Sequence, residues 1–223
     1  MLIIFDLDDT LVETSKFLTP YALERAFDVM VKAGLNIENR SEGLERLFSI
    51  NREALTSGEA LASFVSLHGC DKAILQKGLE ALKRPIPDSL PLEAVPGAIE
   101  LIEELGQENT LSLVTIGSAE LQLQKMKKAG IQQGKFSTIV VERGSSKKSI
   151  YQRILKENGC DPSEVIVCGD RVPIDLSPGK EIGFTTVHFP NGRGRYFSTP
   201  KEDVDHTIPA LKELKKVIEK SRI

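Results

Sequence analysis

Three carboxylates follow the first apolar segment of the chain within four positions. Residues 2–5 (LIIF) run directly into Asp6, Asp8 and Asp9. Alternate side chains of an extended segment point to the same side, so we expect Asp6 and Asp8 to face one site together. Two carboxylates held close repel each other unless a cation or a shared proton compensates. The pattern therefore predicts a divalent cation, one ionised carboxylate and a second carboxylate that is available for proton transfer.

The apolar run before these carboxylates predicts where they lie. A short continuous run that contains Ile and Phe is typical of a strand buried on both faces, as in a parallel sheet. Ligands of open α/β sheets bind just beyond the carboxyl ends of the strands. An Asp-rich turn in which Asp9 and Thr10 only cap a helix is the alternative interpretation of the same residues.

A second strand is expected over residues 110–115, and it ends in Thr115. Ile116, Gly117 and Ser118 follow and open a helix. The Thr115 hydroxyl and the free backbone N–H groups of this turn suit a phosphoryl group at a helix N-terminus. Ser118 would also serve as a simple N-cap, and the two roles are compatible.

Lys147 and Lys148 precede the next predicted helix. A lysine on the loop between a strand and a helix of the same sheet can reach back over the strand ends. There it would neutralise a phosphate oxygen and a nucleophilic carboxylate together. The two lysines are adjacent, so both remain candidates for phosphate binding.

A fourth segment repeats the pattern of an apolar strand that ends in acid. Residues 165–168 (VIVC) are followed by Asp170, and Asp175 comes five residues later. Mg²⁺ binds about six oxygens and is typically held by one or two carboxylates with phosphate and water. Asp6, Asp170, Asp175 and the backbone carbonyl of Asp8 could supply such ligands. Because Ser177 and Pro178 resemble an N-cap followed by the first helical position, Asp175 is expected in the preceding loop.

The order of the predicted elements indicates a mostly parallel sheet with an insertion. Helical periodicity continues from about residue 15 to residue 83 without a convincing strand, and prolines at 85, 87 and 91 then mark the return of the chain. Strands then alternate with helices up to a final helix over 209–220, which is typical of βαβ units. We expect an α/β, Rossmann-like three-layer core formed by 1–14 and 89–223, with an all-α cap at 15–88. The segment 191–195 (NGRGR) is expected to be an exposed loop.

Composition limits the class of protein. The chain has 223 residues, 40% of them hydrophobic and 27% charged, with a formal net charge of −3. It lacks a basic cluster interleaved with aromatics, so nucleic acid is not expected as a partner. No apolar run approaches the length of a bilayer span and no signal peptide is apparent, so a cytoplasmic protein is the default expectation. Cys70, Cys160 and Cys168 lack the spacing of a disulfide framework or a zinc site, and Cys168 is expected in the core.

Asp/Asp, Thr, Lys and Asp/Asp at four successive strand ends resemble the motifs of the haloacid dehalogenase superfamily. The resemblance runs from Leu2 to about Val187, apart from the helical insertion. It implies that Asp6 is a nucleophile that forms an aspartyl-phosphate and that Asp8 is the general acid and then the base. By the same resemblance, Thr115 binds the phosphoryl group and Lys147, preferred over Lys148, holds Asp6 and the phosphate. The implied metal is Mg²⁺, bound by Asp6, Asp170 and Asp175.

These residues predict an Mg²⁺-dependent phosphatase of a small phosphorylated metabolite. Asp8 favours phosphate-ester chemistry within the superfamily, because displacement of a halide needs no acid for the leaving group. The alternatives are a phosphomutase with the same residues and a non-enzymatic phospho-acceptor or binding module. The identity of the substrate and the oligomeric state have no signature in the sequence.

Overall fold

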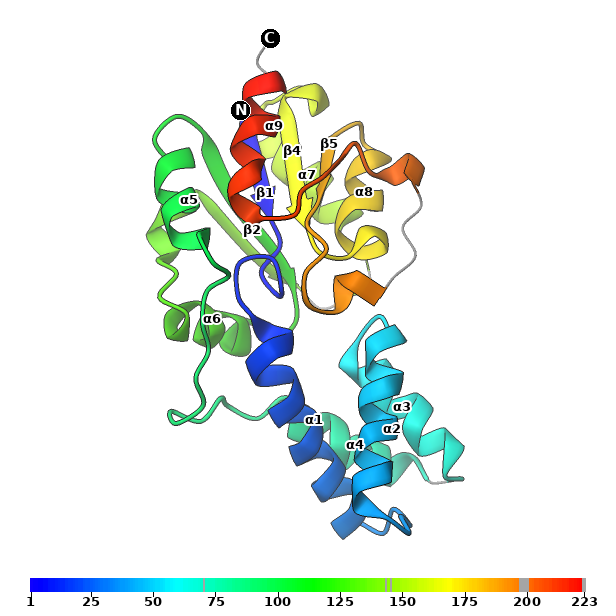
Figure 1. The fold of residues 1–223 in the computed structure, drawn as a ribbon. Helices are drawn as coiled ribbons and strands as arrows, with labels where there is room; N and C mark the ends of the chain where they lie inside the picture. The colour runs from blue at the N-terminus through cyan, green and yellow to red at the C-terminus, as the bar shows by residue number, and fades with distance from the viewer. Residues whose placement is uncertain (70, 143, 145, 197–200, 222–223) are drawn as a thin grey trace. The chain divides into compact units, whose positions relative to one another are not determined.

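The computed structural model describes residues 1–69, 71–142, 144, 146–196 and 201–221. Within this part, the chain divides into two compact units (Figure 1). The first unit comprises Met1–Thr14 and Pro91–Ile223, and the second comprises Ser15–Leu90.

The first unit contains a six-stranded sheet. Its strands are β1 (Leu2–Phe5), β2 (Thr110–Ile116), β3 (Thr138–Glu142), β4 (Val165–Gly169), β5 (Thr185–His188) and β6 (His206–Thr207). The helices of the unit are α5 (Ala98–Leu105), α6 (Ala119–Lys128), α7 (Lys148–Asn158), α8 (Ser177–Lys180) and α9 (Leu214–Ser221). The strand order is β3-β2-β1-β4-β5-β6, and every pairing is parallel. The predicted α/β class with a parallel sheet is confirmed.

Strand β1 lies in the middle of the sheet, between β2 and β4. Phe5 is in register with Leu113 of β2 and with Cys168 of β4. All four residues of β1 are buried, which explains the continuous apolar run. The backbone N–H of Asp6 still donates to the carbonyl of Cys168, at 3.0 Å, so the strand pairing fixes the backbone of the first carboxylate.

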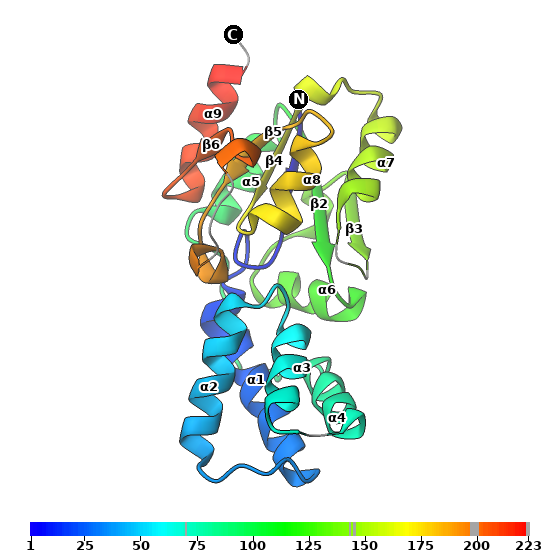
Figure 2. The ribbon, with the colours of Figure 1, turned by 90° about the vertical axis from the view of Figure 1, so that its right-hand side faces the viewer.

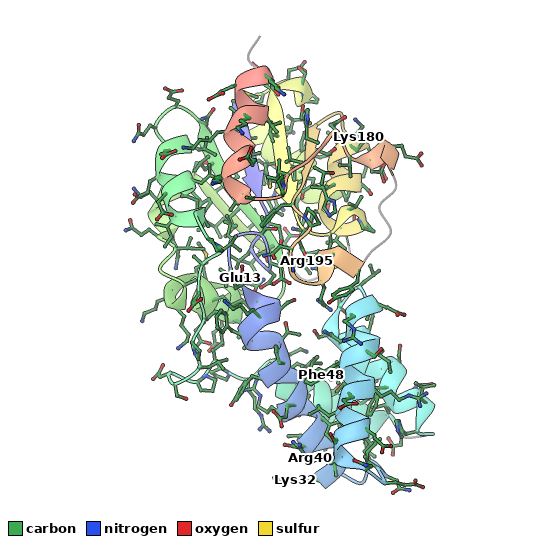
Figure 3. The ribbon with its side chains drawn as sticks, viewed as in Figure 1. Glu13, Lys32, Arg40, Phe48, Lys180 and Arg195 are labelled. Atoms are coloured by element: carbon green, nitrogen blue, oxygen red, sulfur yellow. The ribbon has the colours of Figure 1, made fainter. Side chains whose placement is uncertain are left out.

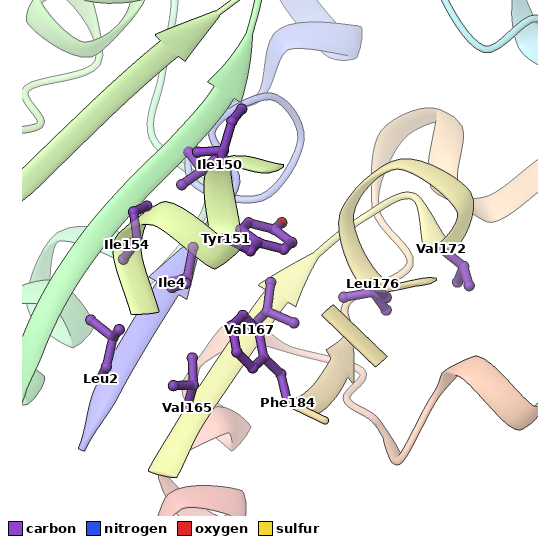
Figure 4. Packing of buried hydrophobic residues seen from close by; sticks show 11 residues of the cluster. Leu2, Ile4, Ile150, Tyr151, Ile154, Val165, Val167, Val172, Leu176 and Phe184 are labelled. Carbon is purple, nitrogen blue, oxygen red and sulfur yellow. The ribbon is translucent and has the colours of Figure 1, made fainter. Parts of the chain in front are cut away.

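Side chains of β1 alternate between the two faces of the sheet. Leu2 and Ile4 pack with Val165 and Val167 of β4 against Tyr151 of α7 (Figure 4). Helices α7 and α9 cover opposite faces of the sheet, as the views from the front and from the side show (Figures 1 and 2). Because Asp6 follows Ile4 by two positions, its side chain is directed to the α7 side.

In the second unit, the described residues form helices joined by turns and irregular segments. Its helices are α1 (Thr14–Lys32), α2 (Arg40–Glu53), α3 (Ser57–Leu67) and α4 (Lys72–Leu82). Asn39, Thr56 and Asp71 cap the last three with side-chain acceptors, as these residue types do at helix starts. A core of its own, built around Phe27, Met30 and Phe64 with neighbouring aliphatic side chains, holds the unit together.

The structure corrects the expected surroundings of Asp175. Val172–Leu176 form a π-helical turn that continues into α8, so Asp175 lies inside a helical segment and not in a loop. The N–H of Ser177 bonds the carbonyl of Val172, five residues back. Pro178 has no N–H to donate. The wide turn accommodates it within the helical segment, so the proline does not mark the start of a new helix. A Ser-Pro pair therefore looks the same in the sequence whether a helix begins or changes register there.

The other element boundaries predicted from the sequence differ less from the structure. Asp9 and Thr10 do not cap a helix, because they lie in a turn and α1 begins at Thr14. Asp9 has φ = 60°, a left-handed conformation that Asp tolerates better than most residues. The final helix begins as a 3₁₀ turn at Leu211–Glu213, and the short strand β6 was not expected.

Two further sequence expectations concern the cysteines and membrane spans. Cys168 is fully buried, as predicted, and Cys160 is a free thiol, whereas Cys70 lies outside the described residues. Among the helices that the structure describes, none combines the length and the apolar character that a bilayer span requires.

Candidate active site

Asp6, Lys147 and Asp175 form a buried charged cluster at the carboxyl ends of β1 and β4. The ammonium group of Lys147 lies 2.6 Å from Asp6 Oδ1 and 2.7 Å from Asp175 Oδ1. It also donates to the carbonyl of Val114, at 2.8 Å. All three charged side chains are at most 4% exposed. The lysine that precedes α7 thus reaches back over the strand ends, as the sequence predicts.

Lys148 does not reach this cluster. Its ammonium group pairs with Glu181 at 2.6 Å, and its side chain is 46% exposed. Of the two adjacent lysines, Lys147 is therefore the one that lies beside Asp6. The difference arises because Lys147 immediately precedes α7 while Lys148 is its first residue, so the two side chains leave in different directions.

Asp170 completes an acidic group that suits a divalent cation. Carboxylate oxygens of Asp6, Asp170 and Asp175 lie within 4.8 Å of one another. Asp6 Oδ2 and both carboxylate oxygens of Asp170 are buried and have no hydrogen-bond partner in the described part of the chain. The guanidinium of Arg171 lies 3.6 Å from Asp170 Oδ1. Buried carboxylate oxygens without donors are costly unless a cation binds them, so the donor set fits Mg²⁺.

The pKa values of Asp6, Asp170 and Lys147 reflect the gathering of several buried carboxylates in one place. Burial raises the pKa of Asp6 to about 7; the charges of Asp175 and Asp8 act in the same direction, and Lys147 opposes them. Burial also raises the pKa of Asp170 well above its usual value, against the charge of Arg171. For Lys147, burial acts to lower the pKa, but Asp175 and Asp6 prevail and raise it. Lys147 therefore stays positively charged. Its single charge does not balance the three carboxylates of Asp6, Asp170 and Asp175.

Asp8 lies in a different electrostatic environment. Its Oδ1 accepts from Lys125 Nζ and from Thr14 Oγ1, both at 2.6 Å, and its Oδ2 accepts from Gln122 Nε2 at 3.0 Å. Burial acts to raise the pKa of Asp8, but the charge of Lys125 and the bonds from Gln122, Lys125 and Thr14 together lower it. None of these three partners was singled out from the sequence.

Thr115 lies where the sequence places it, and the turn after it differs from expectation. Its hydroxyl is buried and accepts from Gln122 Nε2 at 2.5 Å. The carbonyl of Ile116 is 3.4 Å from the same nitrogen. The N–H of Gly117 is not free, because it donates to the carbonyl of Glu142 at 2.9 Å. Ser118 precedes α6 without a side-chain capping bond.

The expectation of an exposed loop at 191–195 is wrong. Asn191 is 4% exposed and donates to the carbonyl of Asp9 at 3.0 Å. A Cβ at Gly192 would lie 2.2 Å from Asp9 Cγ, and one at Gly194 would lie 2.1 Å from the carbonyl oxygen of Asp170. Only glycine permits such an approach. The segment therefore packs against both acidic motifs. Within it, the guanidinium of Arg195, labelled in Figure 3, donates to Asn191 Oδ1 at 2.9 Å.

His188, the last residue of β5, lies outside the motifs that the sequence predicts. Its Nε2 lies 2.9 Å from the carbonyl of Asp170, and the ring is buried. It therefore supports the loop that carries Asp170 without touching the carboxylate cluster.

Comparison with known proteins agrees with this geometry. A family model described as haloacid dehalogenase-like hydrolase matches residues 1–183. The chain belongs to this family of hydrolases, as the motif resemblance predicts.

Two relatives that match nearly the whole chain are named as phosphatases. The chain is 29% identical to the glyceraldehyde 3-phosphate phosphatase of Methanocaldococcus jannaschii, with 97% of this chain and 96% of the relative covered. It is 27% identical to the enzyme of the same name from Pyrococcus furiosus, with 98% and 92% covered. A crystal structure of a predicted phosphoglycolate phosphatase from Haemophilus somnus has a similar fold, with a TM-score of 0.74, 16% identity and 97% of each chain covered.

Proposed function

We propose that the chain is an Mg²⁺-dependent phosphatase that hydrolyses a small phosphorylated metabolite through an aspartyl-phosphate on Asp6. One observation carries the proposal: Lys147 holds Oδ1 of Asp6 at 2.6 Å while Oδ2 is left without a hydrogen-bond partner among the described residues. A carboxylate oriented through one oxygen with the other available suits in-line attack on phosphorus.

The first half of the reaction forms a bond between a carboxylate oxygen of Asp6 and phosphorus and breaks the bond to the leaving oxygen. The negative charge of the bound phosphoryl group favours uptake of a proton from solvent by Asp8. Asp8 gives this proton to the leaving oxygen, and the alcohol leaves. In the second half, Asp8 takes a proton from water, the resulting hydroxide attacks phosphorus, and phosphate leaves with the carboxylate of Asp6 restored. The hydroxyl of Thr115 and the ammonium of Lys147 orient the phosphoryl oxygens.

Asp6, Asp170 and Asp175 would hold the cation. When bound, Mg²⁺ supplies positive charge that offsets the negative charge of the phosphoryl oxygens. Asp175 is fixed for this role by two contacts: its Oδ2 accepts from the N–H of Arg171 at 2.9 Å, and its carbonyl accepts from the phenol of Tyr151 at 2.9 Å.

The names of the curated relatives suggest the substrate class. Two of them, matched over nearly the whole chain, are called glyceraldehyde 3-phosphate phosphatases. We therefore propose a phosphorylated short-chain sugar as the substrate.

The variant Asp6→Asn tests the mechanism. It should abolish the Mg²⁺-dependent release of phosphate from p-nitrophenyl phosphate and from glyceraldehyde 3-phosphate, with an unchanged circular dichroism spectrum. Wild-type turnover in ¹⁸O-labelled water should place one label in each phosphate released. A phosphomutase would instead transfer unlabelled phosphoryl groups to a second acceptor, and full activity in Asp6→Asn would contradict the mechanism.

A further inference from the structure

We infer that Gln122 and Lys125, one turn apart on α6, are positioning residues that set the carboxylate of Asp8 for proton transfer to the leaving group. The inference rests on the proposed function, because it concerns the acid of that reaction. It adds two residues outside the four strand-end motifs.

Lys125 is an unusual residue for its position. It lies in the last turn of a helix that carries two further lysines there, Lys127 and Lys128, yet its own side chain is only 7% exposed and its ammonium group is 2.6 Å from Asp8 Oδ1. Lys127, two residues later on the same helix, is exposed. Burying an ammonium group is costly unless a carboxylate compensates it, so the lysine is present for Asp8 and not for solubility.

Gln122 connects the expected phosphate-binding hydroxyl to the expected acid. Its amide nitrogen is 2.5 Å from Thr115 Oγ1 and 3.0 Å from Asp8 Oδ2. The side chain is 1% exposed. A Cβ at Gly117 would lie 3.2 Å from Cδ of Gln122, so the absence of a side chain at 117 leaves the room that the amide occupies. The relative position of Thr115 and Asp8 thus depends on one amide group.

The resulting arrangement fixes both oxygens of Asp8. Lys125, Thr14 and Gln122 supply three donors to these two oxygens, so the carboxyl group cannot rotate without breaking at least one contact. The donors would therefore set the direction in which Asp8 faces the leaving oxygen.

The test compares two esters of similar size that differ in the leaving group. Phenyl phosphate releases a basic phenolate that gains from a proton, whereas 2,4-dinitrophenyl phosphate releases an anion that does not. The ratio of kcat/KM values reports the first half-reaction only, so it isolates the role of Asp8 as an acid. The variants are Lys125→Met and Gln122→Leu, with Lys127→Met as the matched control and Lys125→Arg as the conservative variant.

We expect kcat/KM of Lys125→Met and Gln122→Leu to fall about a hundredfold with phenyl phosphate, within the range for general acid catalysis, and about threefold or less with the dinitrophenyl ester. Lys125→Arg should recover most of the loss, and Lys127→Met should match the wild type. An equal loss with both esters, or no loss with either, would overturn the inference. Melting curves identify a variant that does not fold, and the other variant then decides the result. A wild-type protein inactive on both esters would instead overturn the proposed function.

Discussion

Lys147 Nζ lies 2.6 Å from Asp6 Oδ1, and the two residues are 141 positions apart in the chain. The contact joins the start of α7 to the end of the central strand and places a permanent positive charge beside the proposed nucleophile. Both side chains are almost fully buried. The position of the nucleophile therefore depends on the packing of α7 against the sheet.

Replacing Lys147 with Met should reduce kcat/KM by at least about a hundredfold, because a donor that stabilises the phosphoryl oxygens is lost. It should also destabilise the fold by about 3 kcal/mol or more, since Asp6 and Asp175 would be left as unpaired buried charges. The matched control is Lys148→Met, which removes a half-exposed ion pair with Glu181 and should stay near wild type in both measurements. Equal effects of the two substitutions in kinetics and urea unfolding would contradict the site.

The raised pKa of Asp6 predicts how stability depends on pH without Mg²⁺. The fold favours the protonated carboxyl, so the contribution of Asp6 to stability is complete below its usual pKa of 3.8 and is lost as the pH rises towards about 7. A cation competes with this proton, so the rise in Tm on adding Mg²⁺ should be larger at pH 8 than at pH 5.5. The variant Asp6→Asn should show a weaker dependence on pH, and an equal Mg²⁺ effect at both pH values in the wild type would refute the prediction.

Substituting Gly194 with Ala should impair both stability and activity. The added Cβ would lie 2.1 Å from the carbonyl oxygen of Asp170, so the backbone must shift, at a cost of about 1–3 kcal/mol. A displaced Asp170 should raise the Mg²⁺ concentration needed for half-maximal activity. Gly134→Ala is the control, because no atom lies within 4 Å of its Cβ position. A Gly194→Ala variant with normal Mg²⁺ dependence would contradict the close packing of this segment on Asp170.

Substituting Tyr151 with Phe removes the hydrogen bond to the carbonyl of Asp175 and keeps the ring in the core. The carbonyl loses its donor, so the free energy of unfolding should fall by about 1–3 kcal/mol. The Mg²⁺ requirement should rise modestly as well, because the backbone of Asp175 becomes less constrained. The measurement is urea unfolding with and without Mg²⁺, and an unchanged midpoint in both conditions would count against this role.

The sequence predicts Asp6, Thr115 and Asp170 of the candidate site because each comes at or just after an apolar strand, and it predicts Lys147 from its place on the loop before a helix. Parallel strands bring their carboxyl ends to one edge, so a short pattern such as residues 2–8 carries information about three-dimensional position. Helical periodicity in the same way predicts an all-α insertion over residues 15–88.

The partners of Asp8 could not be predicted in this way. Lys125 lies in a polar helix among other lysines, and its burial becomes visible only when α6 is placed beside the turn after β1. Similarly, the segment 191–195 has the composition of a solvated loop, and only the backbone path shows that its glycines contact Asp9 and Asp170. The π-helical turn at Asp175 depends on hydrogen-bond register, for which residue types give no signal.

The central place of β1 in the sheet has a consequence for biosynthesis. This strand is translated first, yet its two neighbours, β2 and β4, are translated much later, after the helical unit has emerged. Its apolar residues have no strand partner until Thr110–Ile116 has left the ribosome, and the second partner, Val165–Gly169, follows later. This apolar segment therefore stays unpaired while the helical unit is translated, which makes it the expected point of engagement for a chaperone.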